Sequence, residues 1–136
     1  MEQNQLQLVT YDQAKRLKAL GFDWITDYYY TCEGKSRHFQ FEDNDCYPDN
    51  WNDSNEEDSF CSAPTVALAL KWCRDVKRVH SNISTRGVTV ENECTYYGCI
   101  PEAGLSSSLI TSLFHYYEQA ESALLDKILT LLEQKL

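Results

Sequence analysis

Apolar residues recur at helical spacing near both ends of the chain. In residues 10–20 the apolar positions follow Thr10, which forms a capping-box pattern with Gln13, and Gly21 occupies the usual stop position. In residues 117–134 alanine, leucine and isoleucine side chains form a broad stripe with helical periodicity. The pattern therefore predicts an amphipathic helix in each of these two segments.

A third helix is predicted in the middle of the chain, over residues 62–80. Ser62 provides a cap, and Pro64 is tolerated in the first turn because its missing N–H has no partner there. Leu68 and Trp72 extend the apolar arc beyond a single stripe, so we expect neighbours on more than one side of this helix. The apolar positions at helical spacing are Val66, Ala69, Leu70, Cys73 and Val76.

Runs of aromatic and β-branched residues predict strands between these helices. Residues 28–32 and 35–41 flank a glycine-containing turn, which is typical of a hairpin. Residues 82–90 and 94–100 form a second pair of strands. In residues 107–114 apolar residues alternate with Ser and Thr, which favours a further strand over a helix.

These elements predict an α+β fold for residues 1–136, a length typical of one domain. The element order is α-β-β-α-β-β-(β)-α, with three helices packed on one antiparallel sheet. The residues that we expect to be buried are Leu17, Leu20, Phe39, Leu70, Cys73, Val76, Leu124 and Ile128.

Residues 42–61 are predicted to be a loop, because Asp, Asn and Ser dominate their composition. A stretch of this length without an element of its own is uncommon inside a domain, so the loop is either functional or mobile. Its aromatic residues suggest that part of it folds back on the body of the protein. Within it, residues 42–58 contain eight acids and no Lys or Arg, whereas the other 13 acids are balanced by 12 bases. Nearly the whole net charge of −9 lies in this acidic segment, which argues against general binding to nucleic acid.

The composition also indicates a compartment. The sequence contains no run of about 18 apolar residues, so we expect no membrane span. Its first ten residues lack the basic and apolar regions of a secretory signal, which predicts a cytoplasmic protein with reduced cysteines. The oligomeric state is left open.

Three segments are similar to a group of uncharacterised small proteins from Bacteroidetes gut bacteria and their phages. They are the opening TYDQAKRLKALGFD, the SAPT segment that leads into ALKWCRDVK, and FHYYEQAESALLDKILTLL near the end. Members of this group have a SAPT segment that leads into a Trp-containing helix, and they end with a Tyr-Glu-Glu-Ala helix, where this chain has Tyr-Glu-Gln-Ala at residues 117–120. The resemblance implies a phage-linked setting, and it supplies no catalytic residue.

Metal and disulfide sites are weakly indicated. Cys94 and Cys99 are the only close cysteine pair, whereas a structural zinc site usually needs two such pairs. The acidic segment fails the EF-hand pattern from Asp43, Asp49 or Asp53, which leaves only an irregular calcium site open. A disulfide between the cysteines that bracket the loop, at positions 46 and 61, is disfavoured in the cytosol. We therefore expect no metal and no cofactor.

Enzymatic motifs are missing from the sequence. It has no G-x-S-x-G, no P-loop and no G-x-G-x-x-G. A small enzyme of unknown class remains an alternative, with a site assembled from His38, His80 and neighbouring acids. A second alternative is a nucleic-acid-binding protein that uses the basic face of residues 62–80, which carries Lys71, Arg74, Lys77 and Arg78.

The preferred hypothesis is a non-enzymatic protein-interaction module. A dense anionic segment steers association with a basic surface, here one on a host or phage protein. The phage-linked resemblance makes a regulator or inhibitor of a host nucleic-acid or defence protein one form of this hypothesis. The predicted partner-binding residues are Glu42, Asp43, Asp45, Tyr47, Asp49, Trp51, Asp53, Glu56, Glu57 and Asp58.

Overall fold

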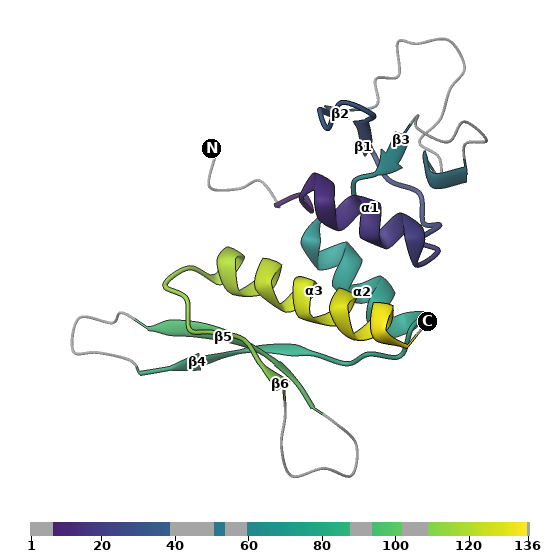
Figure 1. Cartoon of the computed structure of the whole chain (residues 1–136). Coiled ribbons are helices and arrows are strands. Elements are labelled where there is room, and N and C mark those ends of the chain that lie inside the picture. Colours follow the sequence, from purple (N-terminus) through teal and green to yellow (C-terminus); the bar gives the residue numbers. More distant parts are fainter. Residues whose placement is uncertain (1–6, 39–50, 54–59, 88–93, 102–108, 136) are drawn as a thin grey trace. The chain divides into compact units, whose positions relative to one another are not determined.

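The computed structural model describes residues 7–38, 51–53, 60–87, 94–101 and 109–135 (Figure 1). The chain divides into two compact units, Met1–Thr65 and Val66–Leu136. Three helices and antiparallel strands confirm the α+β class. The described strands form two three-stranded antiparallel sheets, where one sheet was predicted.

The first unit contains one helix and one small sheet. Its elements are α1 (Tyr11–Ala19), β1 (Tyr28–Thr31), β2 (Ser36–His38), the 3-10 helix η1 (Trp51–Asp53) and β3 (Phe60–Ser62). β1 is the central strand and pairs antiparallel with both neighbours. The predicted capping box at the start of α1 is present, and the predicted hairpin corresponds to β1 and β2.

Strand β3 and the start of the central helix differ from the prediction. Ser62 does not cap a helix, because it pairs with Tyr29 in the sheet. The chain then stays extended, with the Pro64 carbonyl accepting a hydrogen bond from the Val9 backbone at 3.0 Å. Helix α2 (Val66–Asp75) therefore begins four residues later than the cap pattern indicated.

The second unit consists of α2, strands β4 (Asn82–Arg86), β5 (Thr95–Ile100) and β6 (Leu109–Ile110), and the long helix α3 (Tyr117–Gln134). β5 is the central strand of the β4–β5–β6 sheet. Helix α3 lies against β5 on one side and against α2 on the other (Figure 1). The predicted final helix and the predicted strand pair are confirmed.

The buried core includes most of the side chains expected from periodicity. Leu17, Leu20, Cys73, Leu124 and Ile128 are all buried. The other expected core residues give a different outcome: Leu70 is only half-buried, Val76 is 49% exposed and Phe39 lies outside the described residues. Val76 directly follows α2, and its backbone N–H still donates to the Trp72 carbonyl at 2.8 Å, but its side chain is not covered. Trp72 is the large buried side chain of this helix.

We predict that Arg78→Gly stabilises the protein. Arg78 has a φ of +62°, in the left-handed region that disfavours side chains with a Cβ. This conformation lets the buried Val79 donate its backbone N–H to the Cys73 carbonyl at 3.0 Å after the helix ends. Relief of the strain, less the entropy cost of glycine, should raise the free energy of unfolding by about 0.5–1 kcal/mol in denaturant melts. Arg78→Ala removes the charge but keeps the strain, so an equal gain in that variant would contradict the conformational explanation.

Candidate functional site

Trp51, at the middle of the acidic segment, packs on one face of the β2–β1–β3 sheet. Its ring lies 4.4 Å from that of Tyr29 and 6.3 Å from that of Phe60, and the last two rings are 5.0 Å apart. The register pairs Tyr29 with Ser62 and Thr31 with Phe60, so these side chains share one face of the sheet. We call the rings of Tyr29, Trp51 and Phe60 the aromatic cluster.

Four hydrogen bonds hold η1 against the sheet and the loop that follows α1. Trp51 donates its backbone N–H to the Ser62 hydroxyl at 3.1 Å and its indole Nε1–H to the Thr26 carbonyl at 2.9 Å. Asn52 donates Nδ2–H to the Phe22 carbonyl at 2.8 Å and accepts the Ser62 backbone N–H at 2.9 Å. We call these four bonds the clamp; because it engages backbone groups, it tethers the acidic segment by its middle.

The opposite face of this sheet is directed toward α1. The ring of Tyr30 lies 5.5 Å from that of Tyr11 in α1, and the Tyr30 hydroxyl donates to the Val9 carbonyl. Burial raises the pKa of the Tyr30 phenol, so it remains a neutral donor at physiological pH. This face is therefore part of the core of the unit, and the aromatic cluster is on the other face.

Part of the aromatic surface of the first unit is open to solvent. Phe60 of the cluster is 36% exposed, Tyr28 is 37% exposed and Ile25 is 63% exposed. The ring of His38 lies 4.6 Å from that of Tyr28. Aromatic side chains with a polar atom at one end are the usual anchors of protein interfaces.

The structure describes only two of the predicted partner-binding residues. Trp51 begins η1 and Asp53 ends it. The expectation that part of the loop folds back is confirmed for Trp51, whose ring is engaged by the aromatic cluster and the clamp. The remaining predicted residues lie outside the described part of the chain: Glu42, Asp43, Asp45, Tyr47, Asp49, Glu56, Glu57 and Asp58.

Sequence reasoning missed two functional parts of this site. Phe60 lies in the predicted loop of residues 42–61, but the structure places it at the start of β3. The short run Phe60-Cys61 before a buried segment is a weak strand signal. Asn52 carried no signal at all, because asparagine in an acidic loop is ordinary composition. Asn52 holds η1 in place through hydrogen bonds to two backbone groups, which lie 10 and 30 positions away in the sequence.

The basic face of α2 is partly neutralised within the helix. Lys71 and Arg74 both contact the carboxylate of Asp75. Hydrogen bonding from Lys71, followed by the charges of both bases, holds the pKa of Asp75 below its usual range. Lys77 lies over the ring of Trp72 at 5.6 Å from its centroid. Three of the four predicted phosphate-binding residues thus already interact within the second unit.

The two buried cysteines, Cys61 and Cys73, are thiols in environments that disfavour the thiolate. Burial raises the pKa of Cys73 to about 12 and also raises that of Cys61. Cys61 is unpaired, and Cys46 lies outside the described residues. Cys94 is hydrogen-bonded to Tyr96, and this bond is the largest cause of the raised pKa of the Tyr96 phenol.

The two histidines of the proposed enzyme site lie in different units. His38 is exposed at the end of β2, and His80 is exposed after α2. In the ranges that the structure describes, no three His, Cys, Asp or Glu side chains come together as a metal site.

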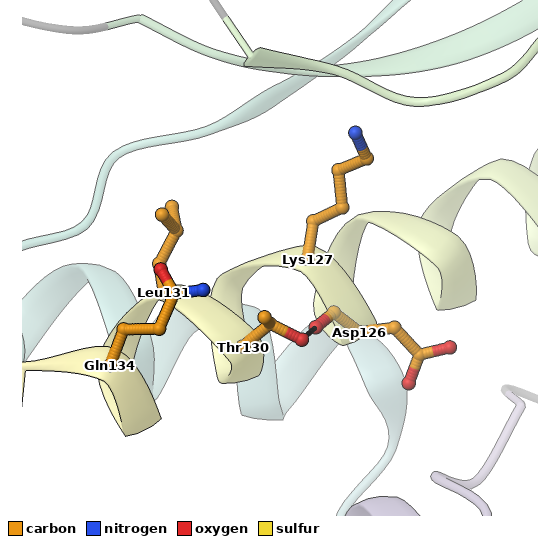
Figure 2. Close-up of a pocket in the computed structure, with 5 residues that line it drawn as sticks. All are labelled: Asp126, Lys127, Thr130, Leu131 and Gln134. Carbon is orange, nitrogen blue, oxygen red and sulfur yellow. Dashed lines mark hydrogen bonds between the residues drawn. The ribbon is translucent and has the colours of Figure 1, made fainter.

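A hollow of about 380 Å³ lies along α3 (Figure 2). Figure 2 shows Asp126 and Lys127 pointing in different directions, while the Thr130 hydroxyl donates to the Asp126 carbonyl at 3.0 Å. The Thr130 hydroxyl is thus engaged by its own helix. The remaining lining residues are Leu131 and Gln134, and the set brings no acid and base together for catalysis.

Comparison of the chain with protein-family models, with curated proteins and with solved structures finds no match. Among the described residues, no helix is both long enough and apolar enough to cross a membrane.

Proposed function

We propose that this protein is a non-enzymatic interaction module that binds a basic surface of another protein through residues 42–58. The observation that carries the proposal is the clamp at Trp51 and Asn52. It attaches the middle of the most acidic segment to a rigid sheet and leaves Phe60 partly exposed beside it.

Charge and aromatic surface have separate parts in this proposal. Eight carboxylates without a Lys or Arg among them attract a cationic partner over long range and increase the rate of encounter. The partly exposed rings supply apolar area that is removed from water once the partner has docked. The resemblance to proteins of Bacteroidetes and their phages makes a host or phage protein the partner to seek.

The charge of the acidic segment is tested by replacing Asp49 and Asp53 with Asn, Glu56 with Gln, and Asp58 with Asn. Affinity capture from a Bacteroidetes host lysate identifies proteins that the wild type retains, and surface-immobilised kinetics measures their association. We expect the variant to associate about tenfold or more slowly at low salt and to depend less on salt, because steering is lost. Its melting temperature should be unchanged or higher, because like charges no longer repel.

A matched control neutralises four exposed acids elsewhere. This control replaces Asp23 and Asp27 with Asn, and Glu33 and Glu133 with Gln. It changes the net charge by the same amount as the acidic-segment variant but leaves residues 42–58 intact. Equal association rates for the wild type and the acidic-segment variant would contradict the proposal. If that variant melts lower and calcium stabilises the wild type, the segment is a calcium site instead.

A further inference from the structure

A second exposed aromatic surface lies at the start of α3, in the second unit. Leu113 is 49% exposed, Tyr116 is 66% exposed and Tyr117 is 45% exposed. Three large, mostly apolar side chains are thus exposed within five positions of the sequence. Such patches mark interaction sites more often than isolated exposed side chains do.

This surface is held in place by the sheet beneath it. Tyr96 of β5 and Phe114 exchange two backbone hydrogen bonds, at 2.7 and 2.8 Å. The ring of Tyr96 meets that of Tyr117 edge-on, with 5.8 Å between centroids and an interplanar angle of 83°. The rings are therefore arranged before any partner binds, which reduces the entropy cost of binding.

Two carboxylates follow Tyr117 on α3, with Glu118 at the next position and Glu121 one turn further on. The pKa of Tyr117 is raised first by burial and then by the charges of Glu121 and Glu118. The pKa of Glu121 is itself raised, by burial and then by Glu118. The N-terminal dipole of α3 accounts for Glu118 in the first turn, but it does not account for a half-buried acid one turn further on.

The sequence around these carboxylates is acidic. Residues 87–126 contain six acids and no Lys or Arg. Residues 87–126 are therefore a second acidic region, although the net charge of the chain outside residues 42–58 is nearly zero. A region of this sign repels nucleic acid and attracts a positively charged protein segment.

We propose that the surface formed by Tyr96, Leu113, Tyr116, Tyr117, Glu118 and Glu121 binds an arginine-bearing segment of a partner protein. The planar guanidinium stacks on a tyrosine ring while its N–H groups reach a carboxylate, and Leu113 contacts the aliphatic part of the segment. Arginine suits this surface better than lysine does, because lysine neither stacks nor donates in a fork. This site is independent of residues 42–58.

The test uses the full chain, labelled with ¹⁵N, and a capped glycine-rich hexapeptide that contains two arginines. The same peptide with citrulline in place of arginine keeps the shape and removes the charge. We expect amide shifts in residues 94–96 and 113–121 with the arginine peptide, and about tenfold weaker binding of the citrulline peptide.

Variants then distinguish the contribution of the Tyr116 ring to binding from that of the Glu121 carboxylate. Tyr116→Ala and Glu121→Gln should each weaken binding by about three- to tenfold, whereas Tyr116→Phe, which keeps the ring, should bind as the wild type does. Glu133→Gln, at the far end of α3, is the matched charge control and should leave binding unchanged. Thermal melts show that the variants are folded; Glu121→Gln should melt no lower than wild type, because burial disfavours the carboxylate that it removes.

Three results would overturn this inference. The first is that the arginine peptide causes no amide shifts, or causes them only outside residues 94–96 and 113–121. The second is that the arginine and citrulline peptides bind equally well. The third is that folded Tyr116→Ala and Glu121→Gln bind the arginine peptide as the wild type does.

Discussion

Gly98→Ala is expected to lower the free energy of unfolding by about 3 kcal/mol, the upper part of the range for overpacked cores. A Cβ at Gly98 would lie 2.7 Å from Cβ of Leu124 and 2.9 Å from its Cδ1. The Leu124 Cβ is attached directly to the backbone of α3, so a rotamer change does not relieve the clash. The helix itself would have to move away from β5, and the contacts along their interface would weaken.

The same substitution also disturbs a buried hydrogen-bonded pair. Gly98 donates its backbone N–H to the Thr111 hydroxyl at 2.8 Å and accepts the Thr111 backbone N–H at 2.9 Å. Movement of β5 away from α3 would strain both bonds, and buried polar groups that lose partners are costly.

Thermal and denaturant unfolding measure the effect of Gly98→Ala, with Gly87→Ala as the control. Gly87 has a φ of +70°, but a Cβ there meets nothing within 4 Å. We expect a loss of about 1 kcal/mol for Gly87→Ala, from backbone strain alone. A loss at Gly98 no larger than at Gly87 would show that β5 and α3 are not packed as closely as the structure has them.

Asn52→Ala is expected to lower the free energy of unfolding by about 2–3 kcal/mol, because one side chain satisfies two backbone groups. Its amide donates to the Phe22 carbonyl and accepts from the Ser62 N–H. Phe22 and Ser62 are almost completely buried, at 1% and 0% exposure, so water does not readily replace the lost partners. Trp51 would also lose its support, and the acidic segment would no longer be held at its middle.

Two comparisons make the Asn52 result specific. Asn82→Ala, at the exposed start of β4, should change the free energy of unfolding by less than about 0.5 kcal/mol. Asn52→Asp keeps the acceptor for Ser62 but sets a carboxylate against the Phe22 carbonyl, so it should be destabilised as well. A stable Asn52→Ala protein with an unchanged Trp51 fluorescence spectrum would contradict the clamp.

The elements that were predicted correctly depend on neighbours in the sequence. The capping box joins Thr10 and Gln13, three positions apart, so its pattern is readable before folding. The length and periodicity of α3 are likewise visible without tertiary information, because an 18-residue apolar stripe is unambiguous. The acidic charge of residues 42–58 is a property of composition alone.

The errors occurred where distant backbone groups compete for a residue. Ser62 has the chemistry of a helix cap, but strand pairing with Tyr29 and the hydroxyl contact with Trp51 engage it first. Val76 follows the helical spacing of its neighbours, yet the helix has ended at Asp75. At Ser62 the local pattern was correct chemistry in a place where tertiary contacts stabilise another conformation.

The sequence by itself determined the α+β class, the outer helices, both strand pairs and the location of the negative charge. Only the tertiary structure decided that the strands form two sheets, where α2 begins, and that Trp51 and Asn52 hold the acidic segment on the β2–β1–β3 sheet. The physical reason is the separation in sequence between the residues that interact. Capping and periodicity join residues three or four positions apart, whereas the clamp joins residues 10 to 30 positions apart. Its partners are mostly backbone groups, which every residue has and which no side-chain pattern identifies.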